Sequence, residues 1–162
     1  MKKVLKYTGF ISLVLVAVAF ILMMATDAVV TSGSVQLRYS GVNAIFGNKD
    51  SILGQNPSVM ALLAWIFMLV GLIIVLCGII LPLLKVKALQ RFAGVLNLVA
   101  VILFVVAGVF MFFVVPTFGA ANNWYSTNGY TIGAGWVIGA ILAIIGGVVA
   151  LLPAAADFLA KK

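Results

Sequence analysis

The 162-residue chain has no histidine and no glutamate, and its one cysteine is Cys77. Without histidine, the sequence excludes His-ligated metal sites, imidazole acid–base catalysis and Ser-His-Asp triads. A lone cysteine cannot form an intrachain disulfide, so disulfide pairing says nothing about the redox compartment. The sequence also lacks a phosphate-binding glycine loop and any metal-ligand spacing. We therefore predict no catalytic residue, no metal and no cofactor.

Charged side chains are scarce as well, at 8% of the sequence, whereas hydrophobic residues make up 65%. A soluble globular protein carries about 25% charged and roughly 45–50% apolar residues. The composition therefore predicts an integral membrane protein. Its acidic residues are Asp27, Asp50 and Asp157, and none of them lies inside a long apolar stretch. This placement argues against a proton- or ion-coupled transporter.

Four apolar stretches are long enough to cross a hydrocarbon core, which takes about 20 helical residues. They cover approximately residues 7–26, 58–84, 92–115 and 131–152. The sequence therefore predicts one all-α membrane domain, 1–162, folded as a four-transmembrane-helix bundle. Prolines are expected to mark the helix ends: Pro57 starts the second helix with Asn56 as N-cap, Pro82 kinks its last turn, and Pro116 and Pro153 end the third and fourth helices.

The net charge of +7 is confined to one side of this arrangement. The two termini and the short link 85–91 carry eight basic residues: Lys2, Lys3, Lys6, Lys85, Lys87, Arg91, Lys161 and Lys162. In the two larger loops, 27–57 and 116–130, Arg38 and Lys49 are balanced by two aspartates. The positive-inside rule therefore predicts cytoplasmic termini, a cytoplasmic link and two outer loops at the cell (plasma) membrane. The lipid bilayer is the expected partner of the basic groups, and a nucleic-acid partner is not expected.

Small residues that permit close backbone approach recur at helix-face spacing in every span. In the first three spans they repeat every seven residues, which favours a left-handed bundle: Ser12, Ala19 and Thr26; Ala64, Gly71 and Gly78; Ala93, Ala100 and Ala107. In the fourth span, Gly135, Gly139, Ala143 and Gly147 form three successive small-xxx-small steps. This face is either the interface of a homo-oligomer or a packing surface against the first or third helix of the same chain.

Asn97 is a polar side chain within the third span. It shares the face of Ala93 and Ala100, which is expected to point into the bundle. Polar side chains at membrane depth normally hydrogen-bond across the bundle. Asn97 is therefore expected to set helix register through such a bond, or else to form a polar step in a solute pathway.

The first outer loop contains two strand-like pieces, 35–39 and 42–46, separated by Ser40 and Gly41. Their composition predicts a small β-hairpin or short sheet. The second outer loop is uncharged and rich in amides, hydroxyls and aromatic rings, which is typical both of an interfacial aromatic belt and of an adaptable binding surface. The candidate outer recognition surface comprises Tyr39, Phe46, Trp124 and Tyr125.

These features favour a non-enzymatic membrane protein that acts through contacts, as a self-associating scaffold or as an accessory subunit of a membrane complex. Its partner would be another copy of the chain or another membrane protein. The alternative is a small oligomeric channel or transporter for a neutral or small solute.

The topology resembles that of claudin-type tetraspan membrane proteins: four spans, cytoplasmic termini, a larger first outer loop with strand-like pieces and a smaller second loop. The first-loop signature of that family (Trp, Gly-Leu-Trp and two cysteines) is absent here. The resemblance therefore implies an arrangement of spans and loops, and it carries no barrier function and no family residue onto this chain. The composition also resembles that of small bacterial four-span membrane proteins.

Overall fold

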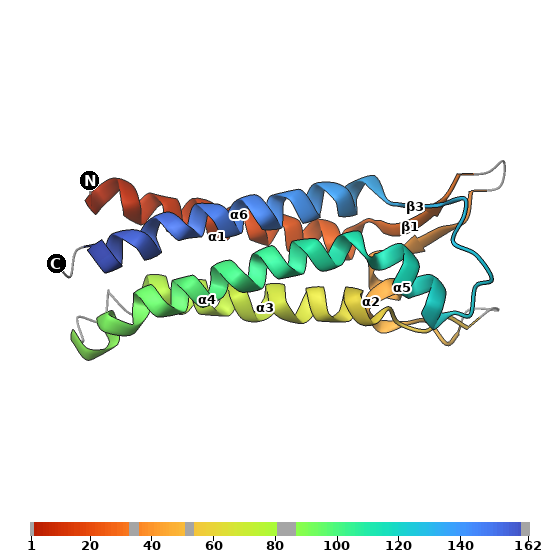
Figure 1. Cartoon of the computed structure of the whole chain (residues 1–162), viewed down its shortest axis with the longest axis horizontal. Coiled ribbons are helices and arrows are strands. Elements are labelled where there is room, and N and C mark those ends of the chain that lie inside the picture. Colours follow the sequence, from red (N-terminus) through yellow and green to blue (C-terminus); the bar gives the residue numbers. More distant parts are fainter. Residues whose placement is uncertain (1, 33–35, 51–53, 81–86, 160–162) are drawn as a thin grey trace.

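The computed structural model describes residues 2–32, 36–50, 54–80 and 87–159. Four long helices lie side by side, with a small sheet at one end and both termini at the other (Figure 1). The helices are α1 (Lys2–Ala25), α3 (Val59–Ile80), α4 (Lys87–Phe112) and α6 (Ala134–Leu159). In the described residues, these four helices are long and apolar enough to cross a membrane. The predicted four-helix arrangement of a multi-pass membrane protein is therefore confirmed at this level.

Helix α6 packs extensively against both α1 and α4. Helix α3 completes the bundle through its contact with α4, while α1 and α3 touch less extensively. Where α6 meets its neighbours, its glycines lie against Val16 of α1, against Thr26 directly after α1, and against Val105 of α4. The short distances between backbones explain why bulkier side chains are absent from these positions.

The start of α3 differs from the sequence prediction. The helix begins at Val59, and the Ser58 hydroxyl accepts a hydrogen bond from the Ala61 amide at 3.3 Å. Ser58 is therefore the N-cap, and the prediction of Asn56 as cap with Pro57 in the first helical position is wrong. The reason is that Asn56 is used elsewhere: its side-chain amide donates to the carbonyl of Ala121 at 3.0 Å.

Pro116 and Pro153 lie at different positions in their helices. Near Pro116 the chain leaves α4 at Phe113 and enters a second helix, α5 (Val114–Ala121), whose first turn contains Pro116. A first-turn position suits proline, since its missing N–H has no intrahelical acceptor there. The prediction that Pro153 ends the fourth helix is wrong, because α6 continues to Leu159. A helix in a membrane tolerates proline when neighbouring groups form hydrogen bonds with the backbone carbonyl that has lost its N–H donor. The predicted kink at Pro82 lies outside the described residues.

The sheet joins the two connecting loops at one end of the bundle. Its strands β1 (Asp27–Thr31), β2 (Arg38–Ser40) and β3 (Tyr130–Ile132) are antiparallel in the order β2-β1-β3. A short sheet is present as predicted, but only β2 overlaps a predicted strand, 35–39. β1 lies earlier in the first loop, and β3 lies at the end of the second loop, where the fourth span was expected to begin.

The predicted strand 42–46 is wrong, because these residues form the short helix α2 (Gly41–Phe46). The Ser40 hydroxyl accepts a hydrogen bond from the Asn43 amide at 3.2 Å and so caps the helix. Gly41 begins the helix at a place where a Cβ atom would overlap the carbonyl oxygen of Met23. The cap and this close contact with the end of α1 therefore override the strand-like composition of the segment.

Close approach of α4 and α6 makes a first testable prediction. A Cβ atom at Gly108 would lie 2.8 Å from the Ala140 carbonyl oxygen and 2.6 Å from a side-chain carbon of Ile144. Gly108→Ala should therefore destabilise the bundle by about 1–3 kcal/mol through overpacking. The measurement is thermal unfolding of the purified protein in lipid nanodiscs.

Gly9→Ala is the matched control, because Gly9 is also helical and a Cβ there would meet no atom within 4 Å. This control should leave stability unchanged or raise it by up to about 1 kcal/mol through helix propensity. Equal shifts in melting temperature for the two variants would contradict the role assigned to Gly108.

Candidate functional site

The sheet end of the molecule is a compact unit, which we call the cap (residues 26–32, 36–50, 54–58 and 113–133). Its two loops are fastened to each other by a pair of asparagines. The Asn56 amide N–H donates to Asn122 Oδ1 at 2.7 Å, and Asn122 Nδ2 donates to the Asn56 carbonyl at 3.1 Å. The Asn122 Nδ2 also donates to the Phe118 carbonyl at 2.8 Å. The carboxamide of Asn122 thus bridges the first loop to α5.

A second set of contacts links the same loops closer to the helices. The Ser58 and Thr117 hydroxyls share a hydrogen bond of 2.6 Å. The indole N–H of Trp136, which is fully buried, donates to the Met23 carbonyl at 3.0 Å. The Gly133 amide donates to the Ala28 carbonyl at 3.0 Å, where the chain passes from β3 into α6. These hydrogen bonds therefore lie where the cap meets the helix bundle.

Four aromatic rings form a cluster inside the cap. Trp124 stacks on Tyr130 with ring centroids 4.1 Å apart, and it meets Phe118 edge-on at 5.5 Å. Tyr39 reaches the cluster from β2, with centroids 5.4 Å from Trp124 and 5.2 Å from Phe118. Burial, and then the neighbouring Tyr130, raise the pKa of the Tyr39 phenol. Tyr39 therefore stays neutral at physiological pH and can donate a hydrogen bond.

The structure separates the residues of the predicted recognition surface into two places. Tyr39 and Trp124 come together in the aromatic cluster, and Tyr125 lies next to them with its side chain fully exposed. Phe46 lies at the end of α2, where it packs edge-on against Trp65 of α3 at 5.2 Å. Phe46 therefore belongs to the boundary between cap and bundle.

A cavity of about 190 Å³ opens on the cap beside the aromatic cluster. It is lined by Tyr39, Gly54, Gln55, Asn122 and Trp124. The Gln55 side-chain oxygen is buried and has no hydrogen-bond partner. Sequence reasoning identified the two aromatic residues of this cavity but missed Gln55 and Asn122, because no periodicity relates positions in two separate loops.

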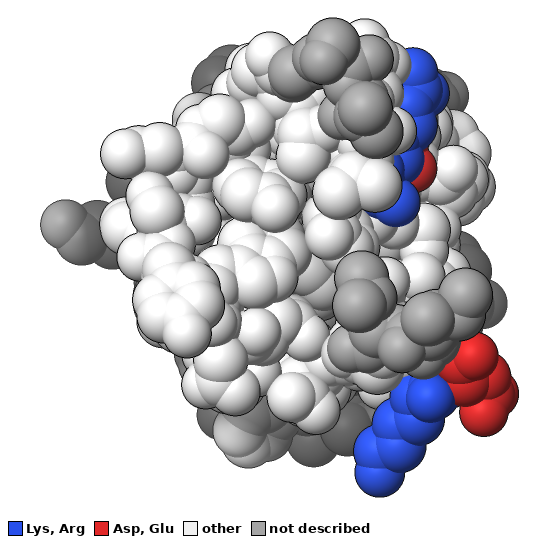
Figure 2. Space-filling model, turned by 90° about the vertical axis from the view of Figure 1, so that its right-hand side faces the viewer, with Lys and Arg blue, Asp and Glu red and all other residues white. Residues whose placement is uncertain are grey.

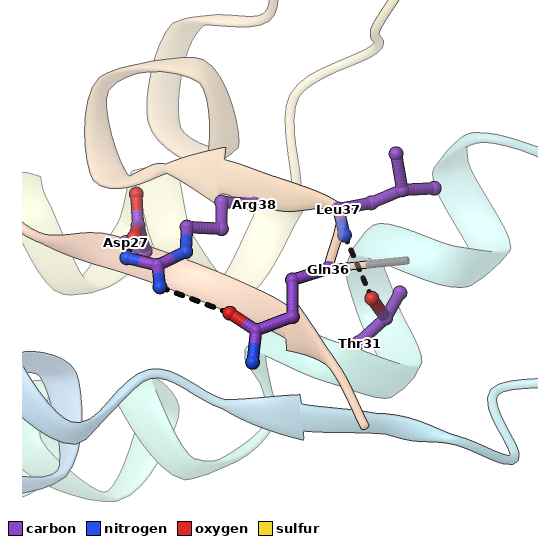
Figure 3. A network of polar contacts seen from close by, with 5 residues as sticks. All are labelled: Asp27, Thr31, Gln36, Leu37 and Arg38. Atoms are coloured by element: carbon purple, nitrogen blue, oxygen red, sulfur yellow. Dashed lines mark hydrogen bonds and ion pairs between the residues drawn. The ribbon is translucent and has the colours of Figure 1, made fainter. Parts of the chain in front are cut away.

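The described charged groups of the cap lie in two pairs along one margin of its surface. Arg38 and Asp27 approach to 3.6 Å, and Arg38 also donates to the Gln36 side chain at 3.0 Å (Figure 3). The other charged groups are the chain neighbours Lys49 and Asp50. Figure 2 shows these groups at the edge of an otherwise uncharged described surface. Within the described ranges, no three Asp or Cys side chains group to hold a metal ion.

The predicted small-residue face of α6 lies inside the bundle. Gly135 lies against Thr26, directly after the end of α1, and a Cβ atom at Gly139 would lie 3.3 Å from the carbonyl oxygen of Ala19 in α1. Ala143 is fully buried, and a Cβ at Gly147 would lie 3.2 Å from the carbonyl of Val101 in α4. These positions therefore face α1 and α4 of the same chain, as in the packing alternative.

Polar side chains in the helices lie against glycines of neighbouring helices. The fully buried Ser12 hydroxyl donates to the Gly146 carbonyl at 2.6 Å, which ties α1 to α6. Asn97 lies on α4 beside Gly78 of α3, where a Cβ would come within 2.7 Å of the Asn97 side-chain oxygen. Among the described residues, Ser12 thus makes a hydrogen bond between two helices, while Asn97 contacts Gly78 of α3.

Comparison of the chain with protein-family models and with curated proteins gives no match.

The Asn122 bridge makes a second prediction. Asn122→Ala removes two hydrogen bonds that hold the first loop to the end of α5 and a third to Phe118 within α5, so it should lower the free energy of unfolding by about 1–3 kcal/mol. Amide hydrogen exchange of residues 54–58 should become faster, while exchange in the α1–α6 contact should not. Asn128→Ala is the matched control in the same loop, because Asn128 is exposed. Equal exchange rates in the two variants would show that the bridge does not hold the loops.

Proposed function

We propose that this chain is a non-enzymatic multi-pass membrane protein that acts through contacts made by its cap, either as a self-associating scaffold or as an accessory subunit of a membrane complex. The observation that carries this proposal is the exposed Tyr125 beside the rigid aromatic cluster of Trp124, Tyr39, Phe118 and Tyr130. Tyrosine and tryptophan supply large contact area at low entropic cost, so an ordered aromatic group at a protein surface favours recognition.

The construction of the cap supports the same proposal. A surface binds tightly when its groups are already held in their bound positions, since less conformational freedom is lost on association. Here the sheet contains strands from both loops, and hydrogen bonds between Asn56 and Asn122 join the two loops a second time. The largely uncharged surface in Figure 2 suits another membrane protein better than a strongly charged partner.

Self-association would use the cap or the lipid-facing sides of the helices. The glycines of α6 are already in contact with α1 and α4, so they are not free to join a second copy. The likeness to claudin-type tetraspan proteins is proposed for topology alone.

We also propose that the cap lies outside the cytoplasm and that both termini lie in the cytoplasm of a cell whose plasma membrane holds the protein. The support is the distribution of charge, since the cap carries Arg38, Lys49, Asp27 and Asp50, which sum to zero. In the sequence, the remaining eight basic residues and Asp157 belong to the two terminal segments and the link 85–91.

A photo-crosslinking experiment tests the recognition proposal. Benzoylphenylalanine placed at Tyr125 in the membrane of living cells should give a protein adduct of one defined mass. Twice the mass of the chain would identify a scaffold, whereas another discrete mass would identify a complex with a different subunit. The control position is Phe10, which is 60% exposed on α1. The proposal fails if position 125 yields no protein adduct above the level at position 10.

The orientation has its own test. In a Cys77→Ala background, a membrane-impermeant maleimide should label Tyr125→Cys in intact cells and should not label Lys162→Cys until the membrane is permeabilised. The expected difference follows from the charge distribution between the two ends. Labelling of position 162 alone in intact cells would show that the protein has the opposite orientation.

A further inference from the structure

The short helix α2 in the first loop exposes apolar side chains. Its six residues, Gly41–Phe46, include no charged residue. One face of the helix is buried in the protein and carries Ala44 and Ile45. Another face exposes Val42 at 40% and Phe46 at 49%, and these two side chains are neighbours because they lie four residues apart. A surface helix normally presents polar residues to water, so this exposed face of α2 is poorly suited to water.

Contacts with α3 show that α2 lies at the level where the bundle begins (Figure 1). The Ser58 amide, directly before α3, donates to the Ala44 carbonyl at 2.8 Å. The Phe46 ring packs against Trp65, which lies within the candidate span Val59–Ile80, with ring centroids 5.2 Å apart. At 1.5 Å per residue this 22-residue span is about 33 Å long, close to the roughly 30 Å thickness of a hydrocarbon core. The first turn of α3 therefore lies at a membrane boundary, and α2 lies there with it.

The exposed face of α2 is continuous with helix surface that belongs to two spans. Trp65 of α3 also contacts Phe20 of α1, with ring centroids 6.2 Å apart. Both Phe20 and Trp65 are partly exposed, and each lies in a candidate span. Tryptophan is enriched where a membrane meets water. Lipid that covers the exposed parts of these two rings therefore extends onto Phe46, whose ring contacts Trp65.

We propose that α2 is an interfacial helix, whose Val42 and Phe46 side chains insert among the acyl chains of the leaflet on the cap side of the membrane. Helices at this level bury an apolar face by about 5–10 Å at the boundary between headgroups and acyl chains. Insertion holds the first loop, and with it the cap, against the bilayer. This inference goes beyond the proposed function and does not rest on it, because recognition was assigned to the surface at Tyr125 and its test uses that position.

Site-directed spin labelling of the full chain in phosphatidylcholine vesicles tests the proposal. In a Cys77→Ala background, Val42→Cys or Phe46→Cys carries one nitroxide, and power saturation measures its collisions with oxygen and with a water-soluble nickel chelate. Oxygen concentrates among acyl chains, whereas the chelate stays in water. The ratio of oxygen to nickel collisions at both positions should be several-fold higher than at Asn128→Cys, the control at an exposed position in the second loop. It should approach the ratio at Ile73→Cys, which is 52% exposed on α3.

Two results would overturn the proposal. A ratio at positions 42 and 46 as low as that at position 128 would show that this face of α2 is in water. Few collisions with either reagent would show that protein covers the face, and spectral broadening between nitroxides would identify that protein as a second copy of the chain. If Phe46→Cys does not fold because it loses the contact with Trp65, the label at position 42 decides between these outcomes.

Discussion

The close contact of α6 with α1 and α4 determines how the rest of this molecule is arranged. In a membrane, lipid tails are as apolar as leucine, so helices associate through tight van der Waals packing and a few hydrogen bonds. Here the backbone of α6 approaches its neighbours at Gly139, Gly146 and Gly147, and the Ser12 hydroxyl donates to the Gly146 carbonyl. Larger side chains at these glycines would push the helices apart and remove that bond. The positions of both loops follow from this packing, since each loop leaves from one of these helices.

The junction between the helix bundle and the sheet is also closely packed around glycines. A Cβ atom at Gly133 would overlap the carbonyl oxygen of Asp27, and one at Gly135 would overlap the side chain of Thr26. The end of α1 and the start of α6 are therefore in contact just where β1 begins and β3 ends. Because β1 begins beside the point where β3 ends, the two strands run in opposite directions and pair antiparallel. Helix packing thus brings the second loop onto the first, and the hydrogen bonds of Asn122 fix it there.

Much of the architecture could be predicted from sequence, because the four spans follow from long apolar stretches alone. The small-residue face of α6 was also visible, but its spacing could not show whether the contact lay within one chain or between chains. The strand predicted at 42–46 is wrong, because a short, mostly apolar segment fits either structure. The deciding contact, between Gly41 and Met23, joins residues far apart in the sequence. Contacts between loops leave no periodic signal, which is why Gln55 was missed.

Two side-chain amides that line the cavity of the cap contribute differently to its hydrogen bonding. Asn122 and Gln55 line one cavity, and their carboxamides have the same chemistry. The Asn122 carboxamide forms hydrogen bonds with Asn56 and Phe118, so its removal would loosen the fold. Gln55 is anchored through its backbone, and its side-chain oxygen contributes no hydrogen bond to the described structure. The Asn122 carboxamide therefore stabilises the contact between the two loops, whereas the Gln55 side-chain oxygen takes no part in that contact.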